Sequence, residues 1–250
     1  MTNSTRCTCS ATPPTDEGCA RGVLDRTGRP VLTNRSVNTN VPRRPPASPS
    51  TPGTRSRILA TAADEFGARG FAATTVDRIA RRARVNKAMI YYHFPNKRAL
   101  YTAIVRGHFS PIVEKLAAIA AEPAPPDQQL DRLIQTLVQA IDASKPFLPI
   151  FLREIADGAV HLGSEDLALL AGIFGTVRSV IAEGTRKKVF QPIHPALAHF
   201  TIIAPAIMFR ATAPVRARIE ATRGVVIPDA DPSTVVKHLQ MVARRMLARE

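Results

Sequence analysis

The chain has 250 residues, of which 45% are apolar, and a formal net charge of +14. This apolar content is ample for a buried core, which excludes a wholly disordered protein. The charge is uneven: residues 1–54 carry +4, residues 55–109 carry +8 and residues 110–250 carry only +2. The dense basic segment favours a polyanion such as DNA as partner, because each cation that neutralises a phosphate releases counterions.

Residues 1–51 are predicted to be a disordered N-terminal tail. Residues 1–53 are rich in Thr, Ser, Asn and Arg, contain eight of the 21 prolines, and lack a periodic apolar pattern. Arg43-Arg44 could contact DNA as part of a flexible arm, and a wrongly assigned translation start is the alternative. The three cysteines all lie in this tail, so the sequence predicts neither a disulfide framework nor a metal site: Cys7, Cys9 and Cys19.

The sequence shows no targeting segment. Residues 1–30 lack the apolar central stretch of a signal peptide, and the longest apolar run, Phe200–Phe209, is too short to cross a bilayer. We therefore expect a cytoplasmic protein with no membrane partner.

Helical periodicity begins at Thr54 and continues to residue 109. Gly70 is placed at a left-handed helix end, Thr74 or Thr75 offers an N-cap hydroxyl, and Asn86 and Asn96 cap the helices that follow. The predicted helices span about 55–69, 76–83, 87–93 and 97–109.

Beyond a proline-rich break at 123–126, apolar residues follow a 3.6-residue period over 130–141. Neither a strand pattern nor a repeat is present, so a second, all-helical domain is expected. Its further predicted helices span about 147–156, 165–185, 195–212 and 233–249.

The predicted helix 87–93 has two different faces. Ile90 and Phe94 are four residues apart and are expected to be buried together, while Ala88 and Tyr92 point the opposite way. The exposed face combines a cation, two phenolic hydroxyls and small or apolar groups, which suits a DNA groove: Lys87, Ala88, Met89, Tyr91 and Tyr92. Aromatic packing on a neighbouring domain is the alternative.

Three further side chains are expected to reach phosphates. His93 and Lys97 flank the end of this helix, and the start of the next helix adds a site that favours anions. Thr75 can contribute its hydroxyl and backbone amide in the same way.

This pattern resembles the TetR family of transcriptional regulators over about residues 55–105. The matching positions are Arg57-Ile58-Leu59, Phe66, Gly70-Phe71, Thr74-Thr75-Val76, Ile79-Ala80, Ala83, Val85, Tyr91, His93-Phe94, Lys97 and Leu100. The resemblance implies that Tyr91, His93 and Lys97 bind phosphates, and that Lys87, Ala88 and Met89 lie nearest the bases, with Asn86 beside them. The chain departs from the family at Arg84, where a glycine is common in the turn, and at Met89.

The resemblance also implies an all-α fold with an N-terminal three-helix helix-turn-helix domain at 52–112 and a helical ligand-binding and dimerisation domain at 113–250. A homodimer would form through helices 165–185 and 195–212 and bind a palindromic operator in double-stranded DNA. Candidates to bind an unknown small-molecule effector are Phe147, Phe151, Glu154, His161 and Arg178. A buried Arg178–Glu154 salt bridge is the alternative for two of them.

Two other functional classes compete with a transcriptional regulator. An enzyme is disfavoured because the sequence has no glycine-rich phosphate loop, no histidine pair at i and i+4, and no nucleophile elbow. We expect no catalytic residue, cofactor or metal. A ligand-independent architectural DNA-binding protein is the remaining alternative, although such a protein would need no large apolar second domain.

Overall fold

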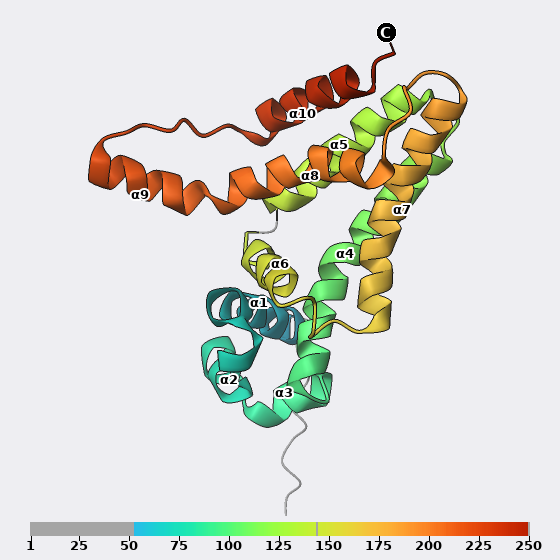
Figure 1. The fold of residues 1–250 in the computed structure, drawn as a ribbon. Helices are drawn as coiled ribbons and strands as arrows, with labels where there is room; N and C mark the ends of the chain where they lie inside the picture. The colour runs from blue at the N-terminus through green and yellow to red at the C-terminus, as the bar shows by residue number, and fades with distance from the viewer. Residues whose placement is uncertain (1–52, 144, 250) are drawn as a thin grey trace, which may run out of the picture. The chain divides into compact units, whose positions relative to one another are not determined.

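The computed structural model describes residues 53–143 and 145–249, and within these ranges it is all-helical (Figure 1). The predicted tail at 1–51, including Arg43-Arg44 and the three cysteines, lies outside the described residues. The helices are α1 Thr54–Ala73, α2 Val76–Ala83, α3 Lys87–His93, α4 Lys97–Ala121, α5 Pro126–Ala143, α6 Phe147–Ala156, α7 Ser164–Arg186, α8 Pro195–Ala211, α9 Ala213–Arg223 and α10 Pro232–Leu247.

Helices α1 to α3 form the three-helix unit that the sequence predicts. The Thr75 side chain accepts a hydrogen bond from the Arg78 amide at the start of α2, and Asn86 accepts one from the Met89 amide at the start of α3. Between these helices Arg84 adopts a left-handed conformation, with φ 54° and ψ 48°. The α2–α3 turn therefore keeps the left-handed geometry that glycine favours, although Arg84 carries a side chain there.

Gly70 also has a positive φ, of 77°, and its backbone angles are not helical. The regular helix is thus interrupted at Gly70, next to the predicted end at residue 69, and a further turn continues beyond this kink to Ala73. The Thr74 hydroxyl then donates to the carbonyls of Glu65 and Gly70, at 3.1 and 2.8 Å.

The predicted end of the fourth helix at residue 109 is wrong. Helix α4 continues through Pro111 to Ala121, because buried side chains extend its inner face on both sides of the proline: Ile104, Val105, Phe109, Ile112, Leu116 and Ile119. The carbonyl that loses its hydrogen bond belongs to Gly107, which is exposed, so water can solvate it. The boundary expected at 112/113 thus falls inside a continuous helix.

Helix α4 connects the N-terminal unit to the remaining helices. It packs on α1 at one end and on α5 and α7 farther along, while α5 also contacts α7, α8 and α10 (Figure 1). Helix α6 packs on α1 and reaches α8. Helices α4 and α6 are therefore the elements through which the C-terminal helices can act on the N-terminal unit.

Pro205 lies inside α8 without ending it. Both Pro205 and Thr201, whose carbonyl loses its partner, are exposed, so water can solvate that carbonyl. Helix α9 is absent from the predicted elements, although Pro214 in its first turn and Gly224 directly after it are ordinary helix-boundary signals.

Helix α7 has an unusual combination of length and apolar character. By length and composition alone it could cross a bilayer, with a mean hydropathy of 1.5, and so could the pair α8 and α9, which is bent by 46°. Only 28% of the apolar window of α7 is buried among the described residues. Much of the apolar surface of α7 is therefore not covered by the other described helices.

Candidate DNA-binding surface and effector cavity

Helix α3 presents the exposed face that its sequence predicts. Ile90 and Phe94 are buried, Ala88 is exposed, and the side chains of Tyr91 and Tyr92 are 44% and 76% exposed. Met89 is half-buried and packs against the core. The two phenol rings, rather than Met89, are thus the most accessible large groups of α3.

Lys87 begins this face and has an ionic partner. Its ammonium lies 2.9 Å from a carboxylate oxygen of Asp77 on α2, and the hydrogen bond to Asp77 raises the pKa of Lys87. Both side chains are largely exposed, so the pair can separate in favour of a phosphate at little cost.

Lys97 is not placed as the sequence suggested. Its ammonium donates to the carbonyls of Phe71 and Thr74, at 2.8 and 3.0 Å, and lies 4.3 Å from the centre of the Phe71 ring. Its charge therefore stabilises the end of α1 and is not directed at solvent. His93 is half-buried, and its Nε2 is buried without a partner in the described part of the chain, so this nitrogen is not presented to a phosphate.

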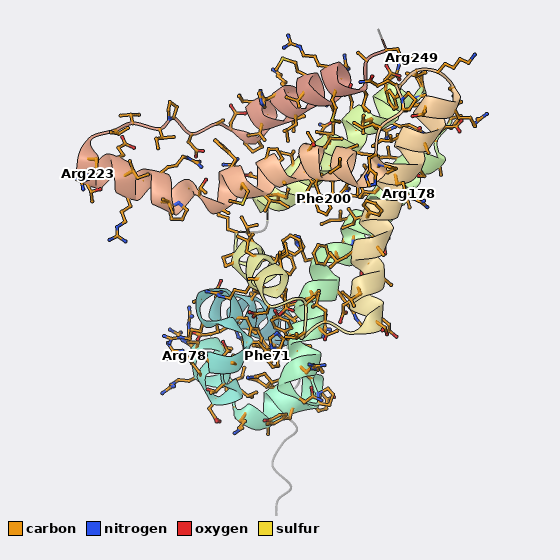
Figure 2. All side chains as sticks on the ribbon, in the orientation of Figure 1. Phe71, Arg78, Arg178, Phe200, Arg223 and Arg249 are labelled. Carbon is orange, nitrogen blue, oxygen red and sulfur yellow. The ribbon has the colours of Figure 1, made fainter. Side chains whose placement is uncertain are left out.

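The N-terminal unit contains an ionic cluster that the sequence analysis missed. Glu65 of α1 is 1% exposed, and its carboxylate lies 2.6 Å from Arg78, 2.5 Å from Arg82 and 3.4 Å from Arg69 (Figure 2 labels Arg78). Burial by itself would raise the pKa of Glu65, but the hydrogen bonds and charges of Arg82 and Arg78 lower it below the ordinary value. This cluster fixes α2 on α1 and holds the three guanidinium groups around one buried carboxylate.

The C-terminal helices enclose an apolar cavity of about 560 Å³. This volume lies within the range of about 300–1,000 Å³ that is usual for small-molecule sites. Helices α4, α5, α6, α7 and α8 supply the lining: His108, Phe109, Ile112, Leu137, Ala140, Ile141, Phe147, Leu148, Phe151, Ile155, Leu170, Ala171, Ile173, Phe174, His199, Phe200, Ile203 and Ile207.

Two of the five predicted effector contacts, Phe147 and Phe151, line this cavity, whereas Glu154, His161 and Arg178 do not. Arg178 is exposed on α7, and the Arg178–Glu154 salt bridge considered as the alternative is not formed. Helix α6 lies between the cavity on one side and α1 and α4 on the other. Phe151 therefore lines the cavity, while Glu154, which follows it closely in the sequence, contacts Tyr101 of α4. The sequence does not show which of these residues faces the cavity.

Glu154 instead belongs to a polar cluster beside the N-terminal unit. Its carboxylate accepts a hydrogen bond from the Tyr101 hydroxyl at 2.5 Å and lies 2.8 Å from Nδ1 of His161. Burial and the bond to Glu154 raise the pKa of Tyr101, so its hydroxyl keeps its proton. The His161 ring also lies 4.5 Å from the ring of Phe71, which connects the α6–α7 loop to α1.

Two histidines are the polar members of the cavity lining. The His108 ring is stacked on Phe147 at 3.9 Å, and burial lowers its pKa to about 4. His199 lies between Phe174 and Phe200, at 5.2 and 5.3 Å, and burial lowers its pKa as well. A histidine on an otherwise apolar stretch of helix is the sequence signal that could have indicated His199.

Helix α8 contains many small and apolar residues that would allow close helix approach in the predicted dimer, but most of them face inward. Ala198, Ile202, Ile203 and Ala206 are buried among the helices of the same chain, so ordinary core packing accounts for them. The exposed apolar side chains on α7 and α8 are instead Leu167, Leu197, Phe200 and Met208.

A three-helix unit in which the capped helix α3, called the reading helix below, presents an exposed face, followed by a helical region around a cavity, defines a helix-turn-helix fold. Residues 58–104 match the family model described as bacterial regulatory proteins, tetR family. The transcriptional repressor KstR2 of Rhodococcus jostii is 34% identical over 103 residues, covering 41% of this chain and 50% of KstR2. RutR of Escherichia coli K12 is 28% identical over 175 residues, covering 69% and 79% of the two chains.

Solved structures of regulators share the whole fold. A tetR-family regulatory protein from Rhodococcus RHA1 superposes with a TM-score of 0.63 at 20% identity, covering 80% of this chain and all of the other. FadR of Bacillus subtilis, in complex with stearoyl-CoA, gives a TM-score of 0.61 at 15% identity, covering 77% and 98%. The chain is thus similar to tetR-family regulatory proteins in the sequence of residues 58–104 and in its helical fold. The aligned segment spans half the length of KstR2.

Proposed function

We propose that the protein is a transcriptional repressor that binds a palindromic operator as a homodimer and is released from DNA by a small apolar effector. The observation that carries this proposal is helix α6, which lines the cavity on one side and is hydrogen-bonded to the DNA-binding unit on the other. A cytoplasmic location is part of the same proposal.

The surface of α3 supports the DNA contact. Tyr91, Tyr92 and Ala88 are exposed, Lys87 has only an exposed ionic partner, and Thr75 and Asn86 lie at the two helix starts. We propose these six residues, with Met89 at the edge of the face, as the DNA contacts. Lys97 and His93 act by positioning, because the ammonium of Lys97 and Nε2 of His93 are turned inward.

The exposed apolar side chains of α7 and α8 support the homodimer. Leu197 and Met208 on α8 are 64% and 53% exposed, and Leu167 on α7 is 44% exposed. A second copy that brings its own α7 and α8 against this face would bury these groups in a four-helix arrangement. This explains why α7 has the composition of a membrane-spanning helix without requiring a membrane.

Helix α6 offers a route from the cavity to the reading helix. The guanidinium group of Arg153 donates to the carbonyls of Phe66, Gly67 and Ala68 on α1. Helix α6 starts directly on α1, since a Cβ atom added to Gly67 would lie 2.7 Å from the Pro146 carbonyl oxygen. An effector that displaces Phe147 or Phe151 therefore moves α1, and it favours release if it prefers the conformer in which the two reading helices no longer match the groove spacing.

The test uses the full chain and duplexes selected from a random pool, with binding followed by fluorescence anisotropy over a salt series. We expect a palindromic winner, and we expect Lys87→Ala to weaken its binding about tenfold at low salt. Lys237→Ala removes the same charge from the exposed face of α10 and should leave binding unchanged.

Equal, weak binding to every duplex would overturn the operator proposal and favour the architectural alternative. Repression is tested separately by placing the selected sequence between a promoter and a reporter gene. Expression should fall when the protein is present, whereas a rise would show an activator.

A further inference from the structure

Among residues 53–143 and 145–249, no Lys, Arg, Asp or Glu side chain lines the cavity. A charged group that enters such a site loses its hydration and finds no counter-ion, which costs several kcal/mol. The part of an effector inside the cavity is therefore uncharged. A free carboxylate, an ammonium group and the phosphates of a coenzyme A thioester all lack a partner among these residues.

Aromatic rings enclose the cavity from two pairs of helices. Phe109 of α4 lies 5.2 Å from Phe147 and 5.7 Å from Phe151 of α6, as measured between ring centres. Phe174 of α7 and Phe200 of α8 form the second group, on either side of His199. A ligand in the cavity thus meets apolar surface over most of its own surface.

His199 is the exception within this apolar wall. The residue is 9% exposed, and its Nδ1 atom is buried with no hydrogen-bond partner in residues 53–143 and 145–249. A buried nitrogen without a partner carries a desolvation cost, which a ligand can remove by forming the missing bond. Burial lowers the pKa of His199, so the neutral ring can donate or accept according to its tautomer.

We propose that the effector is an uncharged, largely apolar small molecule with one hydrogen-bonding group, such as an alcohol, phenol or ketone, and that the imidazole ring of His199, which lines the cavity, binds this group. The inference rests on the proposed effector-controlled function and specifies the chemistry of its ligand. The rim of the cavity agrees with an apolar entrant, because Phe200 and Ile155 line it and are 61% and 59% exposed.

The experiment compares matched probes by equilibrium dialysis against the full-length protein. A linear set contains decan-1-ol, decan-2-one, decanoate, decylamine and decanoyl-CoA, and a flat set contains 2-naphthol and 2-naphthoate. In at least one set we expect the neutral members to bind about a hundredfold more tightly than the charged members of the same shape. Charged probes that bind as tightly as the neutral ones, decanoyl-CoA included, or an absence of neutral binding in both sets, overturn the inference.

The variant His199→Leu tests the hydrogen bond while keeping an apolar side chain at the site. We expect it to weaken the neutral probe about fivefold to tenfold and to leave 1-methylnaphthalene, which has no hydrogen-bonding group, unaffected. His238→Leu on the exposed face of α10 is the matched control. Equal weakening of both probes would show that His199 acts only in packing.

Anisotropy with the selected duplex separates this inference from the proposed function. A protein that binds DNA but releases it for no neutral probe contradicts the effector class alone. A protein that binds no duplex specifically, yet prefers the neutral probes, contradicts the repressor proposal while the cavity chemistry stands.

Discussion

The N-terminal unit and the C-terminal helices are stabilised in different ways. Helices α2 and α3 have eight and seven residues, and each begins at a side chain that accepts a hydrogen bond from the first turn. In the C-terminal part α6, α8 and α9 begin without such a bond, as α1 does, whereas α10 is capped by Asp231. Short helices are marginal in isolation, so α2 and α3 depend on local polar contacts in addition to apolar packing, whereas the residues around the cavity are almost all apolar.

This difference suits the proposed roles. Polar contacts with defined geometry, such as the Glu65 cluster, hold a reading surface in one conformation. Apolar side chains around a cavity of about 560 Å³ lack such directional bonds and can rearrange around a ligand. The comparison predicts that polar substitutions in the N-terminal unit alter stability strongly, and that α6 is where the two regions depend on one another.

The largest effect is expected for Glu65→Gln. Removing the buried charge that holds Arg78 and Arg82 should lower the free energy of unfolding by about 2–3 kcal/mol, as measured by urea denaturation at fixed protein concentration. Because the folded-state pKa of Glu65 is lowered, its stabilisation is present above the ordinary value of 4.5 and lost as the pH falls through the folded-state pKa. The difference in the free energy of unfolding between the unaltered protein and Glu65→Gln should therefore become smaller at acidic pH.

Glu183→Gln is the control for this substitution. Glu183 pairs with Arg186 and Lys187 on the surface of α7, and we expect no measurable change at neutral pH. A similar loss in both variants would contradict the special role of the buried cluster.

The next effect is expected for Gly67→Ala, at the contact between the two regions. The added methyl group would lie 2.7 Å from the Pro146 carbonyl oxygen, so α1 and α6 must move apart, at a cost of about 2 kcal/mol. Effector-dependent release from the duplex should weaken at the same time. Gly107→Ala in α4 is the control. A Cβ atom added there would meet nothing within 4 Å, so the free energy of unfolding should stay the same or rise by about 0.5 kcal/mol. Unaltered release in Gly67→Ala would show that α6 does not transmit the signal.

A smaller effect is expected for Lys97→Met, which keeps the apolar stem but removes the ammonium from the carbonyls of Phe71 and Thr74. The free energy of unfolding should fall by about 1 kcal/mol, while the slope of DNA affinity against salt stays as in the unaltered protein. A decrease of about 1 in that slope would instead restore Lys97 as a phosphate contact. Lys237→Met controls for the loss of one charge.

The smallest effect on stability is expected for Tyr92→Ala. This side chain is 76% exposed, so the free energy of unfolding should change by less than about 0.5 kcal/mol. Affinity for the selected duplex should nevertheless fall about tenfold, measured by anisotropy. Val226→Ala, at a 65% exposed position after α9, should alter neither quantity. Unchanged DNA affinity in Tyr92→Ala would exclude Tyr92 from the contact surface.

The sequence by itself predicted the bounds of α2 and α3 to the residue. The bounds of α2 and α3, the caps Thr75 and Asn86, and the buried pair Ile90 and Phe94 all follow from side chains within a few positions of one another. These features can be predicted because capping hydrogen bonds and helical periodicity depend only on residues that are close together in the sequence.

Only the tertiary structure decided features that depend on residues far apart in the sequence. It extended α4 through Pro111, because distant helices cover both sides of the proline. It turned Lys97 inward onto carbonyls 23 to 26 residues away, and it placed Glu154 with Tyr101 rather than in the cavity. It also placed His199 at the cavity wall, because the cavity exists only where five helices, α4 to α8, pack together.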